Sequence, residues 1–185
     1  RVTFGSDNIK FMKLLYEHLF DMEGGDYITM GDVYVHAKQA TNTSSIVYVF
    51  FGDPALRLNY PKNIVEITSI NDHDVSQTDT LKALQSINIK GVVNDVFGTH
   101  LHDFNGILHV NIYDKDVTYN TYGNEADVFT YKLKNSLIYT GKFKVVDGAF
   151  SADITLPKDI NYSYGKGLIS LYANSENTDA RGSYS

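Results

Sequence analysis

The chain has 185 residues, of which 43% are hydrophobic and 13% aromatic, enough to build a packed core. Its net charge of −6 argues against nucleic acid or an anionic membrane surface as partner, because both favour a basic face. The absence of cysteine excludes disulfides, thiolate catalysis and zinc–cysteine sites within this chain. It has no apolar run of membrane-spanning length and no signal peptide.

The first sixty residues have a helical pattern. After an extended piece at 2–4, Ser6 is a suitable N-cap for a helix over 8–20. Apolar residues recur at helical spacing along that segment, so the helix should be well buried through one broad face. This face comprises Ile9, Met12, Tyr16 and Leu19, widened by Phe11, Leu15 and Phe20. Gly24 and Gly25 end the segment, and Thr29 and Asp32 form a capping-box pattern before a second helix over 30–40.

A β-branched and aromatic run over 47–51 predicts a buried strand. Gly52, Asp53 and Pro54 stop it, with the Asp53 side chain expected to cap or brace the turn. A strand, two helices and a strand would make half of an α/β domain, so residues 1–62 are predicted to be the end of such a domain. Because the chain opens at Arg1 in mid-pattern, we expect it to be a fragment of a longer protein.

From residue 63 the pattern is that of strands separated by turns. An Asp147-Gly148 pair between two good strands predicts a tight primed hairpin. Seven short strands at this spacing predict an immunoglobulin-like antiparallel β-sandwich over 63–185, so the whole chain is expected to be an α+β fragment. The predicted strands cover 63–70, 86–94, 106–114, 127–134, 137–146, 149–156 and 166–173.

Metal ligands are suggested most directly by His100, His102 and Asp103. Residues i and i+2 of an extended segment point to the same side, so the two imidazoles could share an ion. A polar loop between strands is the competing interpretation. Two acidic turns, 71–74 and 114–116, could hold calcium, although neither has the glycine and closing glutamate of an EF-hand. Ordinary loop solvation is the alternative for both.

The 14 tyrosines raise the possibility of a sugar-binding platform, but tyrosine is also favoured in strands and there is no tryptophan. The tyrosines in or beside predicted strands are Tyr113, Tyr119, Tyr122, Tyr131, Tyr139, Tyr162 and Tyr164. No spacing brings Ser, His and Asp into a catalytic set, and no phosphate-binding glycine loop is present. His18 and His36 on the predicted helices are interpreted as surface or packing residues. No catalytic or cofactor-binding residue is therefore assigned.

The run FGDPAL at 51–56, followed by Pro61 and alternating strands, resembles the end of the catalytic domain of gingipain-type cysteine peptidases. The segments 79–95, 101–116 and 156–173 look closer still to the sortase-type peptidases of the type IX secretion system of Bacteroidetes. This resemblance covers roughly 45–182. It implies a caspase-like α/β domain up to residue 62, followed by an immunoglobulin-like domain. The family's nucleophilic cysteine and its histidine would both lie upstream, outside this chain.

Two hypotheses follow. In the first, the chain is the non-catalytic C-terminal part of a sortase-type cysteine peptidase that processes the C-terminal sorting signals of secreted cargo. Its sandwich would brace the catalytic domain and contact protein substrates or secretion-system proteins, at the outer membrane or cell surface. In the second, it is a surface adhesin or glycan-binding module without enzymatic activity. A plain spacer domain is a third interpretation.

Overall fold

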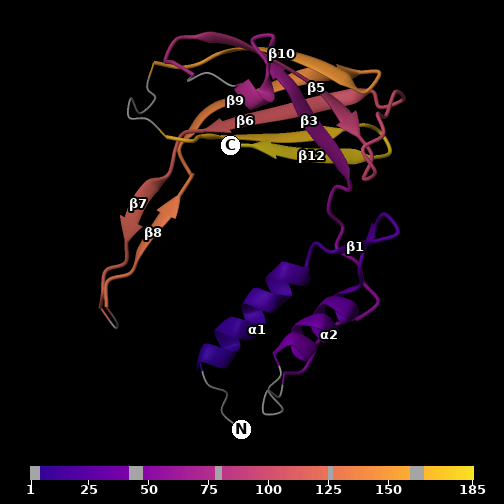
Figure 1. Cartoon of the computed structure of the whole chain (residues 1–185), viewed down its shortest axis with the longest axis vertical. Coiled ribbons are helices and arrows are strands. Elements are labelled where there is room, and N and C mark those ends of the chain that lie inside the picture. Colours follow the sequence, from indigo (N-terminus) through magenta and orange to yellow (C-terminus); the bar gives the residue numbers. More distant parts are fainter. Residues whose placement is uncertain (1–4, 42–47, 78–80, 125–126, 159–164) are drawn as a thin grey trace. The chain divides into compact units, whose positions relative to one another are not determined.

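The computed structural model describes residues 5–41, 48–77, 81–124, 127–158 and 165–185. Two compact units divide it, Arg1–Tyr60 and Pro61–Ser185 (Figure 1). The extended piece predicted at 2–4 lies outside the described residues. No helix in the described ranges is both long and apolar enough to cross a membrane.

The first unit contains two helices and a very short hairpin. Helix α1 spans Gly5–His18, strands β1 and β2 span Met22–Glu23 and Asp26–Tyr27, and helix α2 spans Met30–Ala40 (Figure 1). The prediction of a strand over 47–51 is wrong, because the described residues of that segment, 48–51, have no strand partner. Instead Tyr48 stacks on Phe11 of α1, with ring centroids 4.2 Å apart, and Phe50 meets Tyr34 of α2 edge-on. A caspase-like strand–helix–helix–strand remnant is therefore absent from the described part of this unit.

The broad apolar face predicted for the first helix is buried only in part. Ile9 and Tyr16 are 60% and 65% exposed, and Met12 is also exposed, whereas Phe11 is the buried residue of α1. Phe11 is covered because the aromatic rings of α2 and of residues 48–50 pack on its side of the helix. Helical spacing identified an apolar stripe correctly, but the side that this unit covers is set by its aromatic neighbours.

The capping box at the start of α2 is confirmed. The Thr29 hydroxyl accepts from the Asp32 backbone N–H at 3.1 Å, and the Asp32 carboxylate accepts from the Thr29 hydroxyl at 2.6 Å and from the Thr29 backbone N–H at 3.3 Å. The hydrogen bond that the Thr29 hydroxyl donates to Asp32 is the main cause of the lowered pKa of Asp32, whose ordinary value is 3.8. The cap is therefore formed with an ionised carboxylate.

We predict that Thr29→Ala destabilises α2 by about 1 kcal/mol near neutral pH. A carboxyl whose folded pKa is depressed stabilises the fold above its unfolded pKa, and this contribution disappears as the pH falls through the folded value. The difference between parent and variant should therefore shrink below about pH 4. Urea unfolding followed by the helical circular-dichroism signal measures it, with Thr118→Ala in an exposed strand as the control. An equal loss in both variants would contradict the assignment.

The second unit is a closed ring of seven strands. The ring runs β12–β11–β6–β9–β10–β5–β3 and returns to β12, while the short β4 pairs on β3 (Figure 1). β7 and β8 form a two-stranded sheet of their own. The larger strands are β3 Asn63–Ile70, β5 Ser86–Asn94, β6 Gly106–Tyr113, β9 Leu137–Val146, β10 Ala149–Thr155, β11 Leu168–Asn174 and β12 Asp179–Tyr184. The shorter ones are β4 His73–Asp74, β7 Val117–Asn120 and β8 Thr130–Leu133, with a 3₁₀ turn at Val75–Gln77.

The prediction of an immunoglobulin-like sandwich is wrong, because the sheet closes into a barrel. Closure depends on a parallel seam between the first and last large strands, in which Ala180 pairs with Asn63 and Arg181 with Ile64. Next to this seam the Asn63 side-chain amide donates to the Thr178 hydroxyl at 2.8 Å. No strand was predicted over 179–184, because the polar and small residues of this segment show little alternation. Without that strand the sheet would have two open edges. The sandwich was expected from the number and spacing of the strands, which do not show whether a sheet closes.

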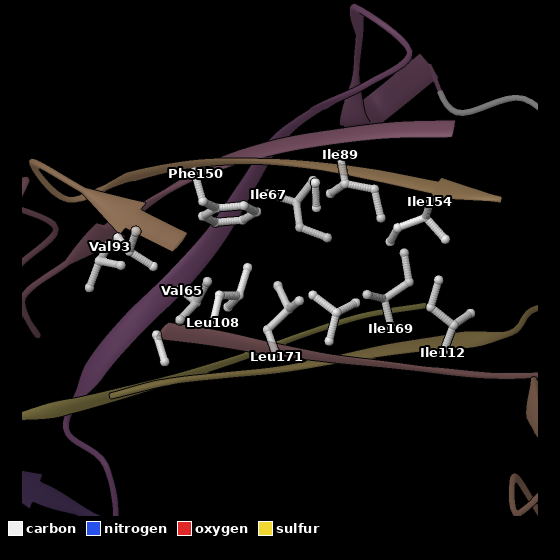
Figure 2. Packing of buried hydrophobic residues seen from close by; sticks show 14 of the residues in the cluster. Val65, Ile67, Ile89, Val93, Leu108, Ile112, Phe150, Ile154, Ile169 and Leu171 are labelled. Carbon is white, nitrogen blue, oxygen red and sulfur yellow. The ribbon is translucent and has the colours of Figure 1, made fainter. Parts of the chain in front are cut away.

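Alternating side chains from the barrel strands fill its interior. From β5 and β10, Ile89 and Ile154 point inward toward Ile112 and Ile169 of β6 and β11, and Leu108 lies in the same layer (Figure 2). In β10, Phe150, Ala152 and Ile154 are buried at every second position, as the period of a half-buried strand requires. The core is formed entirely within Pro61–Ser185.

Most strand positions were predicted within one or two residues. The primed hairpin is also confirmed: Asp147 and Gly148 have φ values of 50° and 72°, both left-handed, and connect β9 to β10. The segment predicted over 127–134 contains only the four-residue β8, and its partner β7 was not predicted. The acidic turn at Asn71 and Asp72 is a second left-handed turn, with φ values of 52° and 62°, between β3 and β4.

Candidate functional site

The FGDP segment caps the second helix. The backbone N–H groups of Met30 and Gly31, in the first turn of α2, donate to the carbonyls of Leu56 and Pro54 at 2.8 and 2.9 Å. Helix N-termini leave such N–H groups without partners inside the helix, so this loop satisfies them. The Asp53 carboxylate accepts from the Ala55 N–H at 2.9 Å, which confirms the predicted brace. The motif is thus a structural clamp within Arg1–Tyr60.

Close packing limits what this clamp tolerates. A Cβ on Gly31 would lie 2.9 Å from the Pro54 Cβ and 3.0 Å from the Pro54 carbonyl oxygen. On the other side of the clamp, the Arg57 guanidinium donates to the Tyr27 carbonyl, and Thr29 forms an isolated antiparallel bridge with Arg57. The segment from 52 to 57 is therefore fitted to the start of α2 by backbone contacts.

The two histidines of the predicted metal site do lie on the same side. The His100 and His102 rings are 4.1 Å apart between centroids. His100 Nε2 is buried without a hydrogen-bond partner, and it lies beneath the Gly148 turn, 2.6 Å from where a Cβ on that glycine would stand. Asp103 is exposed, and within the described ranges no third carboxylate or imidazole joins the pair to make a three-ligand group. A metal at His100, His102 and Asp103 stays a prediction.

Both acidic turns use their carboxylates in local contacts. The Asp72 carboxylate binds the Lys90 ammonium at 2.5 Å, and this hydrogen bond is the main cause of its lowered pKa. Asp74 accepts from the Ser76 hydroxyl and backbone N–H, which lower its pKa. Asp114 lies 3.6 Å from the Lys115 ammonium. These contacts favour structural turns, and calcium there stays a prediction without support from the geometry.

The tyrosines fall into separate groups. Tyr119 of β7 and Tyr131 of β8 stack with centroids 5.8 Å apart, and Phe129 continues the row at 6.4 Å from Tyr131. Tyr122 at the end of this hairpin is 95% exposed. Tyr113 and Tyr139 are half-buried, and Tyr139 packs against the barrel core. Tyr162 and Tyr164 lie outside the described residues. The hairpin thus has a stacked aromatic row that sequence alone did not distinguish from ordinary strand tyrosines.

The first unit contains a cluster of potential metal ligands that was not predicted from the sequence. His18 in the last turn of α1, Asp21 just after it, and His36 on α2 each place a ligand atom within 4.8 Å of the others. His18 Nδ1 is 2.7 Å from the Asp21 carboxylate, and the His18 and His36 rings are 5.3 Å apart between centroids. His18 is half-buried, whereas Asp21 and His36 are exposed. It is the one group of three such ligands among the described residues.

Comparison with solved structures shows a similarity to a known protein. No family model matches the chain, and no curated protein matches it. The crystal structure of dimeric latent PorU from Porphyromonas gingivalis is similar, with a TM-score of 0.63 and 30% sequence identity over 89% of this chain. The similarity supports a relation to PorU. The match covers only 17% of the PorU chain, so it concerns a small part of that protein.

Proposed function

We propose that the chain is the non-catalytic C-terminal portion of a gingipain-type cysteine peptidase of the sortase type, which processes the sorting signals of type IX secretion cargo. The observation that carries the proposal is the similarity to PorU at 30% identity over 89% of the chain. The motif-level resemblance of residues 51–61 and of three later segments points to the same class of protein. The chain has no cysteine, so the nucleophile would be supplied by another part of a longer protein to which this chain belongs.

In this proposal the barrel braces the catalytic part and contacts protein substrates or secretion-system proteins. The exposed apolar stripe of Ile9, Met12 and Tyr16 on α1 supports a covering layer in the parent, because contiguous exposed apolar side chains commonly mark an interface. The similarity to PorU supports our further proposal that the longer protein is exported and lies at the outer membrane or cell surface.

The proposal is tested first by reading the coding frame upstream of Arg1. We expect a histidine and a cysteine, each following a hydrophobic strand in an α/β pattern. The full-length protein and a form that ends after residue 60, and therefore lacks the barrel, are then compared for their removal of C-terminal signals from secreted cargo. Loss of processing with a folded, exported remainder supports the brace. Undiminished processing, or an upstream region without the His–Cys pair, contradicts it.

A second candidate function, glycan binding by a surface module, is favoured by the aromatic row on the β7–β8 hairpin. Stacked, exposed aromatic faces can pack against sugar rings, and Tyr122, Phe129 and Tyr131 are all exposed. A glycan array probed with the chain and with Phe129→Ala/Tyr131→Ala decides this alternative. Binding that depends on these rings would support the glycan-binding function, and an array without binding would exclude it.

A further inference from the structure

We propose that His18, Asp21 and His36 form a binding site for a divalent transition-metal ion, with zinc the preferred occupant. The inference goes beyond the proposed function and does not depend on it. Two imidazoles and one carboxylate are a common ligand set for zinc, and a set of three protein ligands leaves the fourth tetrahedral position to water. The ligand atoms come from two helices and the turn between them, 18 positions apart at the extremes.

The separations allow an ion to be bound with small side-chain movements. In a tetrahedral site with bonds of 2.0–2.1 Å the ligand atoms stand roughly 3.4 Å apart. Here they lie within 4.8 Å, and the nearest pair, His18 Nδ1 and the Asp21 carboxylate, is at 2.7 Å. Asp21 and His36 are exposed, so rotation of their side chains can move the ligand atoms by about an ångström without disturbing a packed core.

The backbone around the cluster is held in place. The Asp21 N–H donates to the His18 carbonyl and the Asp21 carbonyl accepts from the Ile28 N–H, both at 3.1 Å. His36 lies between Val33 and Ala37, the two buried residues of α2, so its position follows from the packing of that helix. Rigid placement of two ligands on packed elements favours a site with a defined geometry rather than a chance surface contact.

The local charge also favours a cation. His18 is the last residue of α1, and the partial negative charge at a helix C-terminus attracts positive ions. Asp21 contributes a formal negative charge, and the Asp32 carboxylate, one turn before His36, interacts electrostatically with both His36 and Arg57. The nearby cation Lys38 is directed to Tyr34, with its Nζ 3.3 Å from the hydroxyl and 5.3 Å from the ring centroid.

Bound metal would join the end of α1 to the middle of α2. Because the ligands belong to separate elements that unfolding would separate, binding would stabilise Arg1–Tyr60 by mass action. The remaining water position makes this an exchangeable site rather than a closed structural one. The competing interpretation is that the His18–Asp21 pair and the His18–His36 ring contact only support helix packing.

The test uses the untagged 185-residue chain, stripped with a chelator and titrated with zinc chloride by calorimetry. We expect one zinc per chain and a rise in the thermal midpoint of the parent. His36→Asn and Asp21→Asn should each weaken zinc binding by at least about tenfold. A cobalt(II) titration should give a tetrahedral absorption band in the parent and lose it in His36→Asn.

Two controls locate the ion. His73→Asn removes an exposed histidine from the barrel unit and should leave binding unchanged. His100→Asn/His102→Asn tests the rival pair. Absence of zinc binding by the parent, equal binding by the parent and His36→Asn, or a loss confined to the His100/His102 variant would each overturn the proposal. Because His36 is exposed on α2, its asparagine variant should keep the parent's circular-dichroism spectrum, so a changed affinity reports on the ligand.

Discussion

Gly182→Ala is expected to destabilise the barrel by about 3 kcal/mol or more, toward the upper end for overpacked sites. Gly182 lies in β12 beside the parallel seam with β3, and a Cβ there would stand 2.0 Å from the Val65 carbonyl oxygen. Since the obstacle is backbone, no side-chain rotation relieves it, and the two strands would have to separate. The φ of Gly182 is outside the left-handed region, so the expected effect comes from space alone.

Urea unfolding followed by the strand circular-dichroism signal measures this loss. Ser183→Ala is the matched control, because Ser183 is the exposed neighbour on the same strand and should change stability by less than about 0.5 kcal/mol. If Gly182→Ala were as stable as Ser183→Ala, β12 could not approach β3 as closely as the closed ring requires, and the closure would have to be revised.

Leu108→Ala is expected to cost about 2–5 kcal/mol. The Leu108 side chain is 0% exposed in β6 and lies in the interior layer of the barrel (Figure 2). Its removal loses the burial of several carbon atoms and leaves a cavity that strands hydrogen-bonded on both sides cannot fill by moving inward.

Ile107→Ala is the control for that substitution. Ile107 is the preceding residue of the same strand, points to the outer side and is 45% exposed, so its truncation should cost less than about 1.5 kcal/mol. The same unfolding measurement compares both variants. Equal costs at the two positions would mean that the inward and outward sides of β6 are assigned wrongly.

Local features were well predicted from the sequence. The Thr29–Asp32 cap, the brace by Asp53 and the Asp147-Gly148 hairpin depend on residues within a few positions of one another, so their chemistry is visible in a short window. The larger antiparallel strands also have an alternation that survives in the structure. The run at 47–51 was predicted as a strand because buried strands and aromatic-rich packing segments share a composition, and only neighbouring elements distinguish them.

At the candidate sites, too, contacts between neighbouring residues could be predicted and contacts between distant segments could not. His100 and His102 are two residues apart, so their shared side could be predicted. His18 and His36 were recognised only as helix residues, because nothing in their spacing tells how two helices face each other. The signal that could have suggested the cluster is the His18-x-x-Asp21 spacing at a helix end, which places a carboxylate within reach of an imidazole.

By itself, the sequence determined the helices, most of the strands, the turns that join them, and the absence of cysteine chemistry within this chain. Only the tertiary structure decided that the sheet closes, because the seam is made by backbone pairing between residues near 63 and residues near 180, more than a hundred positions apart. It alone decided which side of α1 is covered and which histidines meet. Each of these depends on contacts between segments far apart in the chain, and periodicity within one segment carries no information about its distant neighbour.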